Sequence, residues 1–256
     1  MAGNNKLPTT TCNQARLQVF QWTRTPKNIT RCISVVWGEA LITGSLGQAH
    51  ASVVEAIFYN AEKTTMLDEG RVEIIVDPYK VRMSVGGGKK CSYETLDKRI
   101  DEVMTALINL TIYATNQSVK AHIIEKVTLT PKAKKHNPLI NTGPDKITGL
   151  NKSKDRMMWS VIISKEFMDL IRNDLALHYD PLPISQLKTG VAQAITRLIF
   201  THSKKNQPNG GWIIDNLIIA VGAEQFMRER RRDIREDTVN LEKIGIIVDG
   251  DRMKII

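Results

Sequence analysis

Apolar residues recur at helical and strand spacing along two successive parts of the chain. In the first part, the apolar positions of residues 48–61 fit a helix, and residues 71–76 alternate as a strand. Ser92 is expected to cap a longer helix whose apolar residues, spaced by three and four, reach Ile108. The other elements predicted there are a strand at 33–37 closed by turns at Gly38, Gly44 and Gly47, a short helix at 79–85 that follows Asp77 and Pro78, and strands near 110–114 and 119–129.

The second part repeats this order. Its predicted elements are a strand at 157–163, a helix at 165–172, a rigid break at 179–183, a helix at 185–202, a strand at 212–214, a helix at 216–221 capped by Asp215, an arginine-rich helix and a β-ribbon at 246–256. A helix, strand, short helix, longer helix and β-ribbon in succession are typical of a winged helix, a variant of the helix-turn-helix. We therefore predict an α+β fold with two tandem winged-helix domains, at 33–130 and 157–256, with a basic arm at 1–32 and a basic linker or wing extension at 131–156.

The charge of the chain indicates what kind of partner it binds. The 256 residues carry a formal net charge of +9, and their apolar fraction of 42% is that of a globular protein. Residues 1–37 contain five basic residues and no acidic one, and residues 120–156 contain nine basic against three acidic residues. This balance favours a polyanionic partner such as nucleic acid.

The densest cluster of charge lies in the arginine-rich helix near the end of the chain. Arg228, Arg231, Arg232 and Arg235 are spaced by three and four, so they share one helical face. Arginine offers a planar fork of donors that matches phosphate oxygens and the O6/N7 edge of guanine. We therefore predict DNA contact by these four residues. The alternative is a solvated face with intrahelical pairs, such as Arg232 with Glu236.

The analogous helix of the first part gives a second set of candidates. Hydroxyls and backbone amides at a helix N-terminus suit phosphate, and lysine adds charge. Gly86-Gly87-Gly88 is expected to be the turn before this helix and not a phosphate-binding loop, because Met83 and Lys90 replace residues that such a loop requires. The DNA-binding candidates here are Lys89, Lys90, Ser92, Thr95, Lys98 and Arg99.

No catalytic or metal-binding constellation is evident. The three cysteines form no CxxC motif, and the five histidines are dispersed, so we predict no metal, no cofactor and no enzymatic activity. No segment reaches the ~20 apolar residues that span a bilayer, and the N-terminus lacks a signal core. We expect a cytoplasmic protein without a membrane partner.

The run from Met227 to Ile246 (MRERRRDIREDTVNLEKIGI) resembles the recognition-helix segment of RepC-type and TrfA-type plasmid replication initiators. It matches their M-R-x-R-R-x-x-[VI]-R-E run and L-x-x-[LI]-G step without a gap, although Asp237-Thr238 replaces an apolar pair usual in the helix middle. The likeness covers about 100 residues by motif, covers 48–130 by pattern only, and does not extend to 1–32.

The resemblance implies a plasmid replication initiator that binds repeated double-stranded origin sites (iterons), opens the duplex and helps to load a helicase. It also implies contacts with the host replicative helicase and host initiator, and a monomer–dimer equilibrium. Two alternatives remain open at this point. A winged-helix transcription or partition regulator would bind an inverted repeat, whereas a nuclease or relaxase would need clustered acids or histidines around a metal.

Overall fold

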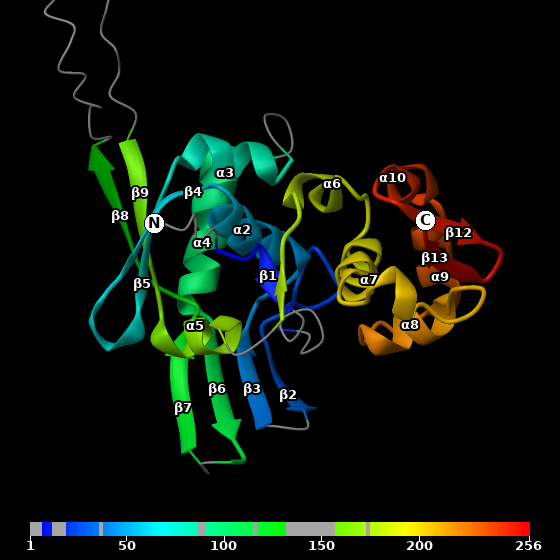
Figure 1. Cartoon of the computed structure of the whole chain (residues 1–256), viewed down its shortest axis with the longest axis horizontal. Coiled ribbons are helices and arrows are strands. Elements are labelled where there is room, and N and C mark those ends of the chain that lie inside the picture. Colours follow the sequence, from blue (N-terminus) through cyan, green and yellow to red (C-terminus); the bar gives the residue numbers. More distant parts are fainter. Residues whose placement is uncertain are drawn as a thin grey trace, which may run out of the picture.

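The protein, in a computed structural model, is a mixed α+β structure with two hydrophobic cores (Figure 1). The structure describes residues 7–11, 19–35, 38–86, 91–114, 117–131, 157–172 and 175–256. All but the first residue of the predicted linker lies outside these ranges. Figure 1 shows the elements of the first core, coloured blue to green, beside those of the second, coloured yellow to red. No helix in the described part of the chain is long and apolar enough to cross a membrane.

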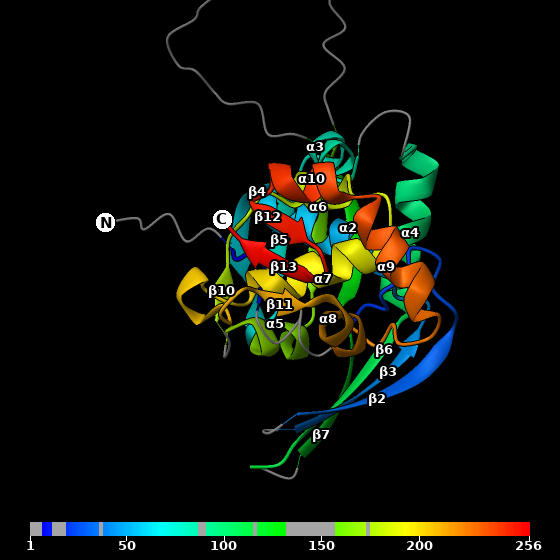
Figure 2. The same ribbon diagram turned by 90° about the vertical axis from the view of Figure 1, so that its right-hand side faces the viewer.

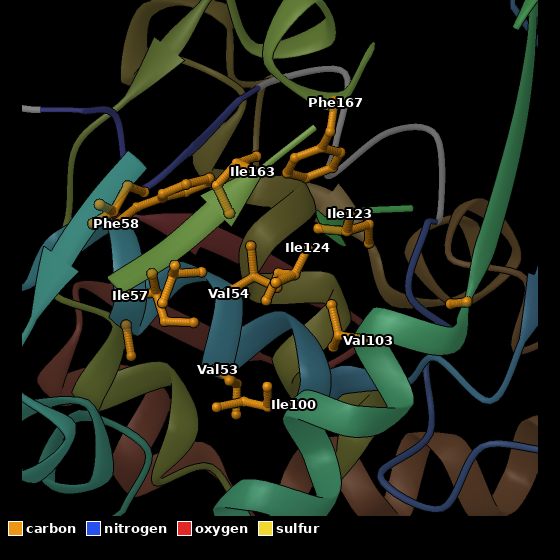
Figure 3. Packing of buried hydrophobic residues seen from close by; sticks show 14 of the residues in the cluster. Val53, Val54, Ile57, Phe58, Ile100, Val103, Ile123, Ile124, Ile163 and Phe167 are labelled. Carbon is orange, nitrogen blue, oxygen red and sulfur yellow. The ribbon is translucent and has the colours of Figure 1, made fainter. Parts of the chain in front are cut away.

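The first core lies between helices and two antiparallel sheets. The strand orders of these sheets are β2-β3-β6-β7 and β4-β5-β9-β8. Figure 3 shows Val53 of α2 beside Ile100 of α4, and Phe58 stacks on Phe167 of α5 with ring centroids 6.4 Å apart. The helices are α2 (Gln48–Tyr59), η1 (Asp68–Gly70), α3 (Pro78–Ser84), α4 (Tyr93–Thr105) and α5 (Lys165–Arg172); the strands are β2 (Ile29–Val35), β3 (Gly38–Gly44), β4 (Ala61–Met66), β5 (Val72–Val76), β6 (Leu107–Ile112), β7 (Gln117–His122), β8 (Ile124–Pro131) and β9 (Met157–Ile163).

The second core is a compact winged helix. Its small sheet has the order β11-β13-β12, so β11, the strand just before α8, pairs with the terminal hairpin formed by β12 and β13. Ile195 of α7, Ile218 of α8 and Ile234 of α9 are fully buried in this core. The elements are α6 (Pro181–Ser185), α7 (Gly190–Phe200), η2 (Lys204–Asn206), β11 (Trp212–Ile213), α8 (Ile214–Ala220), α9 (Met227–Arg235), α10 (Thr238–Lys243), β12 (Ile246–Asp249) and β13 (Arg252–Ile255).

The boundary between the residues of the first core and those of the second lies later in the chain than the predicted boundary at residue 157. Strand β9 lies between β5 and β8 in the sheet of the first core, and Val161 and Ile163 are buried there. Helix α5 packs against the same core through Phe167, Met168 and Ile171. The strand and helix at 157–172 therefore complete the first unit, because a strand needs ladder partners that only this sheet supplies.

Two local predictions differ from the structure at glycine and proline residues, which lie within regular elements there. Gly38 and Gly44, expected to lie in turns, are the first and last residues of strand β3, which lies between β2 and β6. The proposed break at 179–183 contains the start of α6, where Asp180 accepts a hydrogen bond from the Leu182 amide and Pro181 takes the first helical position. The helix expected at 185–202 consequently begins only at Gly190, with Thr189 as its cap.

The predicted N-terminal arm is built into the fold where the structure describes it. Strand β1 (Thr10–Thr11) pairs with β10 (Ala176–Leu177). Val19 is buried in the first core, whereas Trp22 packs against the second. The chain thus contacts both cores before β2 begins.

Candidate nucleic-acid interface

Helices α8 and α9 form the helix-turn-helix of the second winged helix. Ile234 is fully buried and Met227 packs against the core, which fixes one side of α9. Gly222, in the left-handed region with φ of 71°, turns the chain after α8. The opposite side of α9 therefore faces away from the core, as a recognition helix requires.

Three predicted residues lie on that outer side. Arg228, Arg232 and Arg235 are exposed and, with Glu229, line one open hollow on the surface. Arg232 forms ion pairs of 3.7 Å with Asp233 and 3.6 Å with Glu236, and its side chain is 68% exposed. Exposed pairs of this length contribute little to stability, so the guanidinium can exchange them for a stronger acceptor.

The fourth predicted arginine is already engaged. Nε and Nη2 of Arg231 each donate a 2.6 Å hydrogen bond to the carboxylate of Asp215 on α8. These hydrogen bonds hold the pKa of Asp215 below its usual value. The pair ties the two helices of the motif together, so Arg231 positions α9 whether or not it also contacts DNA. Asp215, predicted as the cap of α8, lies in the first turn, and Ile213 occupies the cap position.

Arg230 anchors α9 to the N-terminal segment through Trp22. Its guanidinium lies 4.3 Å from the ring centroid of Trp22 and donates a 2.8 Å hydrogen bond to Asp233. The five arginines of the run are therefore divided: Arg230 and Arg231 fasten the helix, and the other three face outward. Sequence spacing alone did not distinguish Arg231 from its neighbours, because its partner lies 16 residues away.

Asp237 ends the recognition helix. Its buried carboxylate accepts hydrogen bonds from the backbone amides of Lys188, at 2.9 and 2.8 Å, and Thr189, at 3.1 Å. A second short helix, α10, starts after it. The polar residue at 237 thus has a structural role: its carboxylate links the end of α9 to the start of α7.

The candidates on α4 are less favourably arranged. Ser92 caps the helix as predicted, accepting the Thr95 amide at 3.0 Å, and the two hydroxyls are 2.9 Å apart. Lys98 is exposed, whereas Arg99 is half-buried with Nη1 3.7 Å from the Cys91 sulfur. Lys89 and Lys90 lie outside the described residues.

Acidic residues share the outer face of α4. Glu94, Asp97 and Asp101 are exposed at spacings of three and four. Partial burial, followed by the charge of Asp101, raises the pKa of Asp97. Carboxylates can accept from the amino group of cytosine, but they repel phosphates. The exposed face of α4 therefore suits DNA less well than the arginine face of α9.

Comparisons with known proteins agree with the fold. No protein-family model matches the sequence, and neither does any curated protein. A crystal structure of domains 2 and 3 of RctB, as selenomethionine derivatives, matches with a TM-score of 0.62 and 11% identity over 94% of each chain. A second crystal structure of RctB domains 2–3 gives a TM-score of 0.48 and 10% identity over 93% of this chain and 84% of that one. The first match confirms the predicted α+β fold with tandem winged helices.

Proposed function

We propose that the protein is a replication initiator that binds double-stranded origin DNA through its second winged helix. The observation that carries this proposal is the outward face of α9, where Arg228, Arg232 and Arg235 are exposed on a helix fixed from behind. The shared fold supports it, since RctB is the replication initiator of chromosome II in Vibrio.

In this proposal α9 lies in the major groove and its three outward arginines contact bases or phosphates. A bidentate arginine–guanine contact contributes ~1–3 kcal/mol of discrimination against a wrong base. Arg231 acts differently, because Asp215 occupies one edge of its guanidinium. It keeps α9 at a fixed angle to α8, so its loss would change the orientation of the whole face.

The first winged helix adds affinity more than selectivity. The sugar-phosphate backbone of the DNA would be contacted near the start and middle of α4, by Ser92, Thr95, Lys98 and Arg99. The neighbouring carboxylates would limit how closely α4 approaches the phosphates. Binding to iterons, opening of the duplex, helicase loading, a plasmid origin and a dimeric form belong to the same proposal and rest on the family resemblance.

The test is fluorescence anisotropy on duplexes from the noncoding DNA that flanks the gene, with and without direct repeats, across a salt series. We expect tight binding only to the duplex that carries repeats, with several proteins per fragment. Preference for an inverted repeat with one dimer per site would instead support a transcriptional regulator. Equal binding to every duplex that collapses with salt would contradict both functions.

Matched variants test whether the outward face of α9 determines the selectivity for DNA sequence. Arg232→Ala combined with Arg235→Ala should remove the preference for repeats while the melting temperature stays within a few degrees, because both side chains are exposed. Lys205→Ala, in η2 beyond the far end of α7, should change neither. Asp215→Ala frees Arg231 without removing it; loss of selectivity in this variant would show that the helix angle, and not only the arginine charge, matters.

A further inference from the structure

The segment from Val19 to Lys27, called the strap here, is fastened between the two winged helices. The Gln21 amide donates to the Leu46 carbonyl at 2.8 Å, and the Gln48 amide donates to the Thr23 carbonyl at 2.9 Å. The Gln21 side chain closes the strap by donating to the Lys27 carbonyl at 2.8 Å. These bonds hold the strap in one conformation against the start of α2.

Two glycines let the strap approach both helices closely. A Cβ on Gly47, the cap residue of α2, would lie 2.4 Å from the Thr23 carbonyl oxygen. A Cβ on Gly190, the first residue of α7, would lie 2.3 Å from the Trp22 carbonyl oxygen. Helices α2 and α7 therefore both begin against the same short stretch of backbone, residues 22–24.

The strap also reaches the recognition helix. The Trp22 ring lies under Arg230 of α9 at 4.3 Å. Nη1 of Arg24 donates at 3.3 Å to the carbonyl of Lys188, the residue whose amide donates to Asp237. Figure 2 shows the dark-blue N-terminal chain running through the region between α4 and α9.

Basic side chains of the strap remain at the surface. Arg24 and Lys27 are exposed, and residues 19–27 include no acidic residue. Partial burial and then the charge of Arg99 lower the pKa of Arg24, while Asp237 acts in the opposite direction. Two guanidinium groups from different elements are thus close enough to repel each other, and a polyanion placed between them would relieve that repulsion.

We propose that the strap is a third DNA-binding element, in which Arg24 and Lys27 contact phosphates between the sites of α4 and α9. The inference rests on the proposed DNA-binding function and deepens it. If the two helices lie in successive major grooves, the backbone that separates those grooves passes the surface between the helices. The strap occupies that surface on a backbone held by hydrogen bonds and carries exposed cations there, which favours a phosphate ligand over a base edge.

The experiment compares wild type with Arg24→Gln/Lys27→Gln, which removes both charges but keeps polar side chains of similar reach. Each phosphate contact makes the slope of log affinity against log salt more negative by about 0.9. Loss of two contacts should therefore make that slope shallower by about 1.8, which reduces the affinity change between 50 and 200 mM salt by about 12-fold. Affinity should fall equally for the repeat-bearing and unrelated duplexes, so their ratio stays constant.

Arg24→Lys/Lys27→Arg keeps both charges and should retain the wild-type slope, and Lys205→Ala should also leave it unchanged. An unaltered slope in the glutamine variant, with wild type binding normally and both proteins melting together, would overturn the role of the strap. A change in the ratio between duplexes would also overturn it, because phosphate contacts are blind to sequence. Failure of the proposed function has a different signature: wild type itself would show no preference for any duplex.

Discussion

A buried ion pair joins the two winged helices and provides the sharpest test of their coupling. Arg197 of α7 and Glu55 of α2 have side chains only 6% and 4% exposed. Arg197 donates from Nε and Nη2 to the two oxygens of Glu55 at 2.8 and 2.7 Å, and the Tyr179 hydroxyl donates to Glu55 at 2.6 Å. Nη1 donates to Gln48 at 2.7 Å, and Nη2 also donates to Ser52 at 3.0 Å.

Arg197→Met removes the guanidinium while keeping an apolar side chain of similar length. Glu55 is then a buried carboxylate with only the Tyr179 hydroxyl left from this network. Removing one partner of a buried pair costs about 3–5 kcal/mol, since the other charge is left uncompensated. A domain is stable by only ~5–15 kcal/mol in total, so this loss is a large fraction of the free energy of unfolding.

The assay is urea unfolding at neutral pH, followed by circular dichroism and tryptophan fluorescence. Glu55→Met combined with Arg197→Met should recover most of the lost stability, because an apolar pair replaces a buried ion pair at little net cost. Lys80→Met is the matched control: the Lys80–Glu62 pair spans 2.9 Å, but the lysine side chain is 50% exposed. This variant should lose less than about 1 kcal/mol.

Two results would refute the reasoning. A loss below ~1 kcal/mol in Arg197→Met would place the guanidinium in contact with water in solution. A double variant as unstable as the sum of its singles would mean that the two residues do not interact. A third observation concerns coupling: if this pair dominates the contact between the units, unfolding of Arg197→Met should separate into two transitions.

Three further predictions follow from single side chains. Burial lowers the pKa of His50 more than its 2.6 Å contact with Glu102 raises it, so the folded state resists protonation of this residue. The free energy of unfolding should therefore fall as the pH drops below 6.5, by at most ~1.4 kcal/mol per pH unit. The same pH titration of His50→Gln should give a flatter profile. Asp237→Asn should destabilise the protein by about 2 kcal/mol in urea titrations, since a charged acceptor of buried amides is lost, and no loss would contradict that role. Phe226 has a φ of 61° and is 68% exposed, so Phe226→Gly should be no less stable in thermal melts, whereas a clear loss would show that the ring contributes to packing.

The sequence predicts elements well where the signal is local. The cap at Ser92, the proline start of α3 and the arginine helix each depend on residues within a few positions of one another, and the structure has all three. The apolar alternation of residues 71–76 likewise identifies β5. In these cases hydrogen bonds close within one turn or along one strand, so the information needed is contiguous.

The sequence does not reveal which distant segments pair with each other. Strand β9 belongs to the first unit because β5 and β8 lie on either side of it, and no feature of residues 157–163 themselves names those neighbours. The same holds for Arg197, whose helix looks like any amphipathic helix until Glu55, 142 residues earlier, is placed beside it. The choice of partner strand or partner residue arises from global packing, which the local periodicity of a segment does not specify.

The arginine run illustrates how these two levels combine into a site. Spacing of three and four predicts four arginines on one face, and the structure leaves three of them, Arg228, Arg232 and Arg235, on the outer surface. The division into fastening and outward residues depends on what lies behind the helix. Asp215 fixes Arg231, and Trp22 of the strap lies against Arg230. Asp237 then stops the helix at Arg235 and couples its end to Lys188. The outward face is therefore defined by residues from three distant segments, and a change in any of them should alter DNA selectivity without touching an outward arginine.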